Sequence, residues 1–176
     1  MKTERLELIP AAPAMLRAAL EGSEALAGSL AAVVPRSWPP DYLDRAALEY
    51  SLERRPPGSD GLEWWQYFVI LAAARGRTLI GTTGYKGPPS DDGTVELGYS
   101  IVHEYQRRGY ATECVRALLA HSFSSPRVRR VIAETLPELA PSIGVLRKCG
   151  FRLIGAGSEP GVIRFEVLRD ALPDVL

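Results

Sequence analysis

Residues 95–123 read VELGYSIVHEYQRRGYATECVRALLAHSF, and this stretch decides the fold. Residues 94–102 alternate between apolar side chains and polar or small ones, which predicts a strand. Apolar residues then recur at three- and four-residue spacing, which predicts a helix over residues 109–123. The alternation places Leu97, Tyr99 and Ile101 on one face of the strand, and Glu96, Gly98 and Ser100 on the other.

The connection between this strand and this helix has the composition of an anion site. It reads Gln106-Arg107-Arg108-Gly109-Tyr110-Ala111. Backbone N–H groups at the start of a helix lack intrahelical partners, and the helix dipole adds positive potential there. Gly109 and Ala111 leave the backbone open to a ligand, and the two arginines add charged donors. The connection therefore predicts a diphosphate site, with an ordinary structural turn as the alternative. It is neither a Walker P-loop nor a G-x-G-x-x-G turn.

Outward from this stretch, the patterning predicts six more strands and three more helices. The strands are expected at residues 3–9, 64–73, 78–86, 128–134, 151–156 and 162–168. The helices are expected at residues 13–20, from Asp41 or Asp44 to Arg54, and at 141–148, where Gly150 ends the last helix. Together these elements predict a mixed α/β fold with about seven strands and about four helices.

The composition fits a single domain over residues 1–176. The chain has 21 basic and 21 acidic residues, and 46% of its residues are hydrophobic, as in an ordinary compact soluble domain. Its longest apolar run, Phe68–Ala74, is far shorter than the roughly 18–20 residues of a membrane span. No apolar stretch of a secretory signal follows the charged first residues. We therefore expect a cytoplasmic protein that does not enter a membrane.

Charge and ligand spacing argue against two other classes. A net charge of zero is unlike that of a dedicated nucleic-acid binder. The two cysteines, Cys114 and Cys149, and the two histidines, His103 and His121, lack the spacing of a zinc site, so we expect no metal and buried, reduced thiols. Arginines gathered between residues 104 and 130 favour a small phosphorylated ligand, with a solvated helix face as the alternative.

The stretch quoted above, followed by SIGVLRKCGFRLIG at residues 142–155, closely resembles the GNAT superfamily of acyl-CoA N-acyltransferases. Within it the sequence is most similar to the RimJ/RimL-like branch of ribosomal-protein N-terminal acetyltransferases, and the opening TERLELIP at residues 3–10 also matches that branch. The resemblance implies a mostly antiparallel central sheet that splays between its fourth and fifth strands. It also implies direct transfer of an acetyl group from acetyl-CoA to a primary amine in a ternary complex.

The same resemblance implies which residues bind the coenzyme. The residues from Gln106 to Ala111 match the family's signature, whose backbone amides hold the coenzyme A pyrophosphate, and Thr112 would add a hydroxyl at the same helix start. The end of the fourth strand would pair with the pantetheine arm through Ile101, Val102 and His103. A main-chain N–H near Ile101–Val102 would polarise the thioester carbonyl.

Two residues are expected to move protons. Glu96 matches the acidic position on the fourth strand that acts as a base in many family members, and a strand carboxylate paired with an arginine is the alternative. Ser142 is the candidate that protonates the thiolate, because Leu146 stands where many relatives have a tyrosine. A first-turn serine that bonds its own backbone is the alternative. Leu139 and Pro141 also depart from the family pattern, which keeps a non-catalytic acyl-CoA-binding or regulatory module as an alternative function.

The sequence leaves the acceptor open. Trp38, Trp64 and Trp65 are candidates for its pocket, although aromatic residues more often belong to a core. A protein N-terminus is the first expectation from the branch, and a small-molecule amine such as a polyamine, an aminoglycoside or an amino acid is the alternative. Four acids, Asp41, Asp44, Asp91 and Asp92, are candidates to attract a cationic acceptor. The last hairpin offers an edge for pairing in a homodimer or another homo-oligomer.

Overall fold

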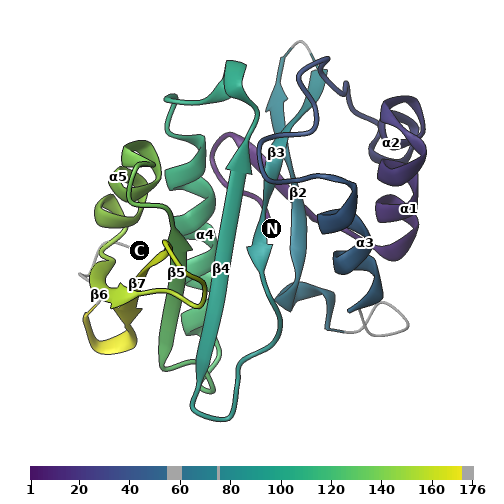
Figure 1. Ribbon diagram of the computed structural model, residues 1–176. Coiled ribbons are helices and arrows are strands. Elements are labelled where there is room, and N and C mark those ends of the chain that lie inside the picture. The colour runs from purple at the N-terminus through teal and green to yellow at the C-terminus, as the bar shows by residue number, and fades with distance from the viewer. Residues whose placement is uncertain (55–60, 75, 172–176) are drawn as a thin grey trace.

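A seven-stranded sheet crosses the molecule in the computed structural model, which describes residues 1–54, 61–74 and 76–171 (Figure 1). The strand order is β1-β2-β3-β4-β5-β7-β6. The strands are β1 (Leu6–Pro10), β2 (Gln66–Ala73), β3 (Gly76–Tyr85), β4 (Thr94–Ile101), β5 (Arg130–Thr135), β6 (Arg152–Ala156) and β7 (Ile163–Leu168). This architecture confirms the predicted mixed α/β class.

The sheet splays between β4 and β5. These two strands are the only parallel neighbours in the described sheet, and every other neighbouring pair is antiparallel. Their register runs from Thr94 opposite Arg130 to Leu97 opposite Ala133. Strand β4 then continues to Ile101 without a paired residue on β5, so a gap opens in the middle of the sheet. The expected splay between the fourth and fifth strands is confirmed.

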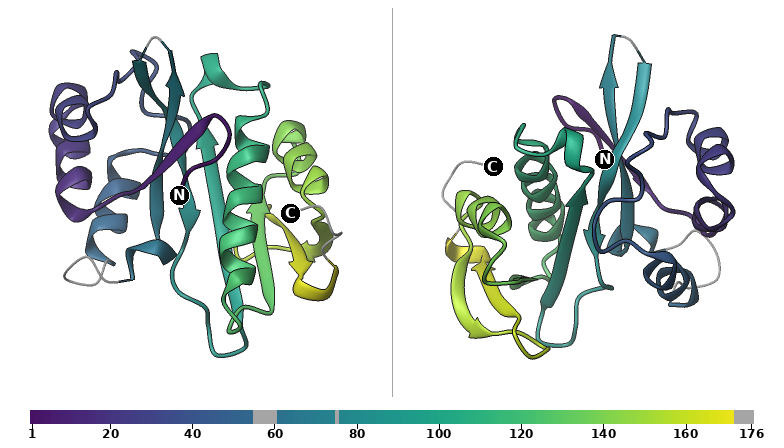
Figure 2. Two further views of the ribbon diagram at one scale, coloured as in Figure 1. Left: turned by 180° about the vertical axis from the view of Figure 1, so that it is seen from behind. Right: turned by 45° about the horizontal axis from the view of Figure 1, so that its top comes forward.

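Five α-helices flank the described sheet, one more than expected. They are α1 (Pro13–Glu21), α2 (Ser23–Leu30), α3 (Arg45–Glu53), α4 (Tyr110–Ser124) and α5 (Ala140–Lys148). The additional helix is α2, a short segment with two glycines nearby that buries only Leu26 and Leu30. Helices α4 and α5 cover the rear of the sheet as it is seen in Figure 1, while α1 to α3 lie beside β2 and β3 (Figure 2).

Two hydrophobic clusters form because β2 is covered on both faces. Tyr67 and Val69 face α4, and Phe68 and Ile70 face helices α1 to α3. This explains why β2 is a continuous apolar run and not an alternating one. Strand β4 alternates as predicted, with the side chains of Leu97 and Ile101 in the larger cluster.

Local signals set the ends of the helices. Asp44, one of the two predicted caps, begins α3 by accepting a hydrogen bond from the Ala47 N–H at 2.8 Å. Gly150 follows α5 at φ +85°, which is the left-handed conformation that glycine adopts most easily.

Cys114 and Cys149 are both buried free thiols. Within the described chain, none of the helices has the length and apolar character needed to span a membrane.

Candidate functional site

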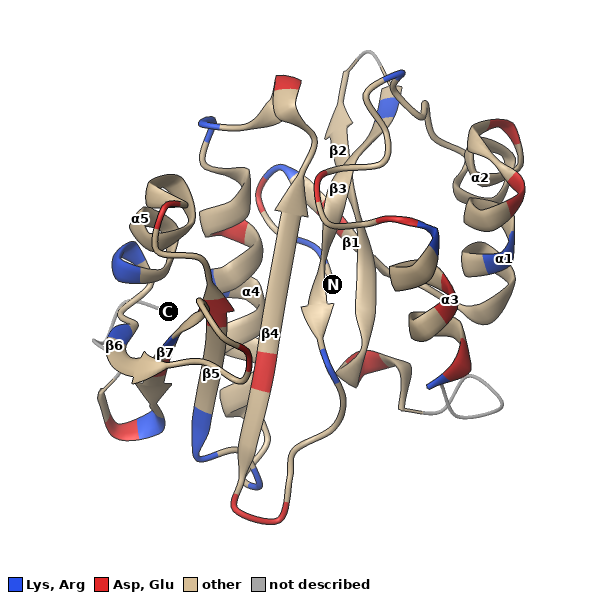
Figure 3. Ribbon diagram, in the orientation of Figure 1, with Lys and Arg blue, Asp and Glu red and all other residues tan. Residues whose placement is uncertain are grey.

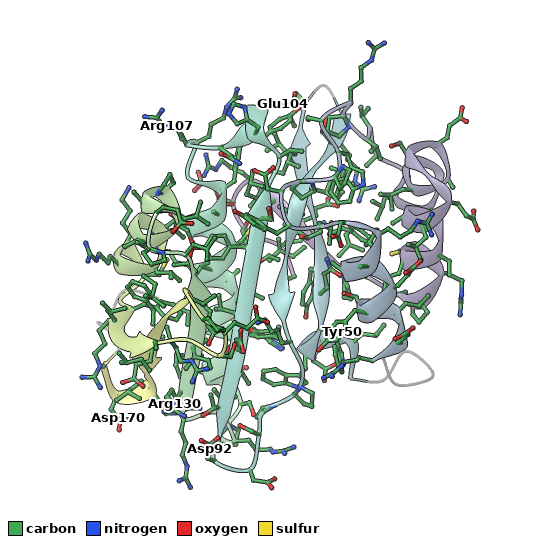
Figure 4. The ribbon with its side chains drawn as sticks, viewed as in Figure 1. Tyr50, Asp92, Glu104, Arg107, Arg130 and Asp170 are labelled. Carbon is green, nitrogen blue, oxygen red and sulfur yellow. The ribbon has the colours of Figure 1, made fainter. Side chains whose placement is uncertain are left out.

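The start of α4 has the geometry of an anion cradle. Gly109 precedes the helix at φ +85°, and the Glu113 N–H is the donor that reaches back to the Gly109 carbonyl at 3.0 Å. The N–H groups of Tyr110, Ala111 and Thr112 therefore belong to the first turn, where helices leave donors for ligands. The loop before α4 contains Arg107 and Arg108 and includes a blue segment in Figure 3, and Arg107 points away from the body of the molecule (Figure 4).

An arginine from the N-terminal segment braces the cradle. The Arg5 Nε atom donates to Glu113 at 2.7 Å, and its Nη1 atom donates to the Arg108 carbonyl at 3.1 Å. Its guanidinium also lies 4.6 Å from the centre of the Tyr110 ring. Burial alone would raise the pKa of Glu113, but hydrogen bonds from Thr3 and Arg5 and the charge of Arg5 outweigh it and lower that pKa. The carboxylate next to the cradle is thus neutralised by Arg5, which leaves the cradle free for an anion.

The sequence did not predict this contact between Arg5 and Glu113. Arg5 and Glu113 are 108 residues apart, and no local pattern connects them. A basic residue beside the first strand and an acidic one in the first turn of the helix were the only signals available.

Gln106 ties the cradle to the end of β4. Its Nε2 atom donates to the Ile101 carbonyl at 2.8 Å. The Val102 N–H donates to the Ile80 carbonyl at 2.9 Å, so it faces β3 and not the gap. Because main-chain groups alternate along a strand, the N–H groups of Ile101 and Tyr99 face the gap. Of the expected pair Ile101–Val102, it is therefore Ile101 that presents its N–H to the opening. His103 lies exposed at the start of the following loop.

Ser142 lies opposite Tyr99 at the rear of the gap. The Ser142 Oγ and Tyr99 hydroxyl oxygens are 3.0 Å apart, and the Tyr99 hydroxyl also lies 3.1 Å from the Ser142 carbonyl. Burial raises the pKa of Tyr99 to about 12, against a smaller lowering effect of the bond with Ser142. Tyr99 therefore keeps its proton at neutral pH. Leu146, at the position where many relatives have a tyrosine, is buried in the core.

Glu96 forms an ion pair with Lys86, the residue that directly follows β3. Its side chain is 21% exposed, and it shares the front face of β4 with Gly98 and Ser100. The alternative to a catalytic base was a strand carboxylate paired with an arginine. The residue that pairs with Glu96 is a lysine. The pair holds the carboxylate at the level of the last residues that join β4 to β5.

A cavity of about 350 Å³ opens on the same front face, between α3 and strands β3 and β4. Its floor includes Gly84 and Gly98, and β4 contributes residues up to Ser100. A Cβ atom added at Gly98 would meet nothing within 4 Å, so this glycine leaves the floor open. Lys86 lines one end of the cavity, which places Glu96 at its border. The β4 residues that line it, Gly98 to Ser100, follow Leu97, the last β4 residue that pairs with β5.

The structure separates the three tryptophans. Trp65 lines the cavity, together with Tyr50, which Figure 4 shows beside β3 and β4. Trp64 packs at the rear against Tyr85, with 5.2 Å between ring centres. Trp38 packs on Phe68, with 6.0 Å between ring centres, and lines a smaller cavity of about 210 Å³.

Among the residues that the structure describes, no group of three His, Cys, Asp or Glu side chains could hold a metal ion.

Comparison with known proteins assigns this chain to one family. A family model described as the acetyltransferase (GNAT) domain matches residues 5–152. Two curated relatives are named as uncharacterized N-acetyltransferases. YjdG of Bacillus subtilis is 25% identical over 160 residues, which are 90% of this chain and 93% of YjdG. The protein p20 of Bacillus licheniformis is 32% identical over 98 residues, so the match spans 55% of this chain and about half (52%) of p20.

The solved structures share the fold. The structure of RimL, a ribosomal L7/L12 alpha-N-protein acetyltransferase in complex with coenzyme A, superimposes with a TM-score of 0.66 at 16% identity. The superposition covers 96% of this chain and 97% of RimL. The family model confirms the resemblance to the GNAT superfamily, and RimL shares the fold of this chain. With a family model that matches most of its length, the chain belongs to the GNAT family of acetyltransferases.

Proposed function

We propose that this protein transfers an acetyl group from acetyl-CoA to a primary amine by direct attack in a ternary complex. One observation carries the proposal. The anion cradle at the start of α4, the gap between β4 and β5, and the front cavity all adjoin strand β4: Gln106 links the cradle to the Ile101 carbonyl, and Gly98 to Ser100 line the cavity. RimL, which shares the fold, was solved with coenzyme A.

The residues of the cradle fit the diphosphate of coenzyme A. The amides that follow Gly109 point out of the helix start, Arg107 and Arg108 are exposed, and Arg5 neutralises the nearby Glu113. Thr112 would add its hydroxyl in the same turn, and the end of β4 would pair with the pantetheine arm. Acetyl-CoA supplies an acyl group that its thioester has already activated.

The main chain of β4 would orient and polarise the thioester. The Ile101 and Tyr99 N–H groups face the gap, where a carbonyl oxygen can accept from them. One such fixed donor is typically worth about 2.7–4 kcal/mol to a transition state. Since a thioester needs little further activation, most of the rate enhancement would come from this positioning.

Glu96 is proposed as the base that takes the proton from the amine. It borders the cavity from the front face of β4, on the side from which an acceptor would enter. The ammonium of Lys86 holds the carboxylate in place. A positioned base of this kind contributes typically about 10²–10⁴-fold.

Ser142 is proposed to deliver the proton to the departing thiolate, with Tyr99 as its partner. The two hydroxyl groups lie at the rear of the gap, away from the cavity that would hold the amine. Because burial raises the pKa of Tyr99, the pair holds a proton at neutral pH. The base and the proton donor thus lie on opposite sides of the strand that would orient the thioester.

Amine-dependent release of the coenzyme A thiol tests the proposal. Wild-type protein should release thiol with at least one class in a panel of N-terminal peptides, amino acids and polyamines. Glu96→Gln should lower kcat by about 10²-fold or more. The matched control is Glu104→Gln, an exposed glutamate outside the cavity, which should retain activity. Acetyl-CoA binding without thiol release for any amine would instead support the non-catalytic binding module.

A further inference from the structure

The charges along the front cavity differ from those of a site for polycations. Arg54 and Lys86 both line the cavity, and the ion pair with Glu96 engages only Lys86. In the described part of the chain, Arg54 has no acidic partner. Its guanidinium lies 4.5 Å from the centre of the Tyr50 ring. A cation held against a ring at the rim of a cavity is placed to meet an anion.

Two of the four acids that were candidates to attract a cationic acceptor have other roles. Asp44 caps α3 through the Ala47 N–H. Asp92 accepts hydrogen bonds from Ser90 and the Thr94 N–H and forms an ion pair with Arg130, in the turn before β4. Of the four aspartates, Asp41 is the one that lines the cavity. A molecule with several ammonium groups, one of them at Glu96, would therefore place another toward Arg54, where like charges repel.

The wall of the cavity is aromatic. Tyr42 is 74% exposed and Tyr50 is 55% exposed, and both line the cavity with Trp65. Exposed rings at a cavity rim provide a contact surface for a planar or apolar body. Gly98 in the floor leaves room for that body next to the gap.

We propose that the acceptor is a monoamine that carries an anionic group, a carboxylate or a phosphate, which Arg54 binds while the amine faces Glu96 at the gap. This inference rests on the proposed function and narrows it. It predicts that polyamines and aminoglycosides are not acceptors. The contact with Arg54 would be a charge-assisted hydrogen bond, which typically favours the anionic acceptor by about tenfold or more over its neutral analogue.

Paired acceptors that differ in one anionic group test the inference. The pairs are phenylalanine and phenylalanine amide, phosphoethanolamine and ethanolamine, and two peptides that differ in Asp or Asn at the second position, with spermidine as the polycation. Each is measured by thiol release, and by calorimetric binding to protein saturated with coenzyme A. The three pairs distinguish a small carboxylate, a phosphate and an acidic peptide as the source of the anion.

We expect the anionic member of at least one pair to have a KM about tenfold lower or more, and spermidine to show neither turnover nor binding. Arg54→Gln should abolish this preference without changing the KM for acetyl-CoA. The control is Arg17→Gln, the same substitution at an exposed residue of α1 outside the cavity. This variant should keep the preference for the anionic acceptor.

Three results would overturn the inference: equal use of both members of every pair, an unchanged preference in Arg54→Gln, or no binding of any anionic member. A failure of the proposed function would be distinguished from these results, because acetyl-CoA would not bind or no amine would give turnover. Where the coenzyme binds without turnover, the calorimetric comparison of paired amines still reads the charge preference.

Discussion

The hydroxyl oxygen of Tyr99 lies 3.0 Å from the Oγ atom of Ser142, so strand β4 and helix α5 meet at the rear of the gap in the sheet. Ser142 is in the first turn of α5, and its backbone carbonyl also lies 3.1 Å from the Tyr99 hydroxyl. The serine therefore bonds outside its own helix, in a position where a departing thiolate would need a proton.

Removal of either hydroxyl should slow the chemical step. Ser142→Ala and Tyr99→Phe should each lower kcat by about tenfold or more and leave the KM for acetyl-CoA nearly unchanged, because proton delivery is lost while the cradle stays intact. Thiol-release kinetics measure both parameters. Ser124→Ala, at the end of α4 and far from the gap, is the control and should behave as wild type. Full activity of both variants would contradict this assignment.

The brace at the cradle should affect coenzyme binding and stability together. Arg5→Gln removes the donors that hold Glu113 and the Arg108 carbonyl, so the free energy of unfolding should fall by about 1–3 kcal/mol. The KM for acetyl-CoA should rise severalfold, because the loop before α4 loses its support. Chemical denaturation and kinetics measure the two effects. Lys2→Gln removes a highly exposed cation from the same segment and should leave both values unchanged.

Side chains added at Gly98 should fill the acceptor cavity without harm to the fold. A Cβ atom there meets nothing within 4 Å, so Gly98→Val should fold and raise the KM of the amine about tenfold or more by steric exclusion. Gly84→Ala is the contrasting variant, because its Cβ would lie 2.3 Å from the Trp65 carbonyl oxygen at a φ of +147°. Thermal unfolding should show a clear loss of stability for Gly84→Ala alone. An unchanged amine KM in Gly98→Val would show that acceptors bind elsewhere.

Acid stability should depend on Glu134. This carboxylate accepts from Arg164 at 2.7 Å and from the Ser158 N–H at 2.8 Å. Burial would raise its pKa, but these bonds outweigh burial and lower the pKa from its ordinary value of 4.5. Its contribution to stability is therefore present above pH 4.5 and is lost as the pH falls through the lowered pKa.

The free energy of unfolding of wild-type protein should thus decrease as the pH falls below 4.5, and Glu134→Gln should show a shallower decrease in that range. At neutral pH the variant should be less stable by about 1–3 kcal/mol. Glu138→Gln, at an exposed position, serves as the control. Identical pH profiles for wild type and Glu134→Gln would contradict this role.

The sequence predicted the elements with strong local patterns. The alternation at residues 94–102 and the helical spacing after Gly109 produced β4 and α4 nearly to the residue. Helix α2 had no corresponding prediction, because its eight residues contain few large apolar side chains. The strand expected from Trp64 begins at Gln66, because Trp64 and Trp65 belong to a turn whose backbone approaches Gly84.

The candidate site was predictable where its residues are close in sequence. The segment from Gln106 to Thr112 forms one loop and helix start, so its pattern predicted an anion site, with an ordinary structural turn as the alternative. Contacts between distant residues left no such signal. The Arg5–Glu113 brace and the Tyr99–Ser142 pair depend on how the sheet brings separate elements together. The tryptophans also show this limit, since only their packing distinguishes Trp65 in the cavity from Trp64 in the core.

A calorimetric titration with acetyl-CoA tests the central claim most directly, namely that the start of α4 and the gap beside it form the coenzyme site. We compare wild type with Gly109→Ala, which adds a Cβ at φ +85° and 3.3 Å from the Arg5 Nη2 atom, and with Gly144→Ala, where the added atom meets nothing within 4 Å. We predict saturable binding to wild type and Gly144→Ala, and binding about tenfold weaker or more for Gly109→Ala. No binding to wild type, or equal binding to all three proteins, would contradict the account.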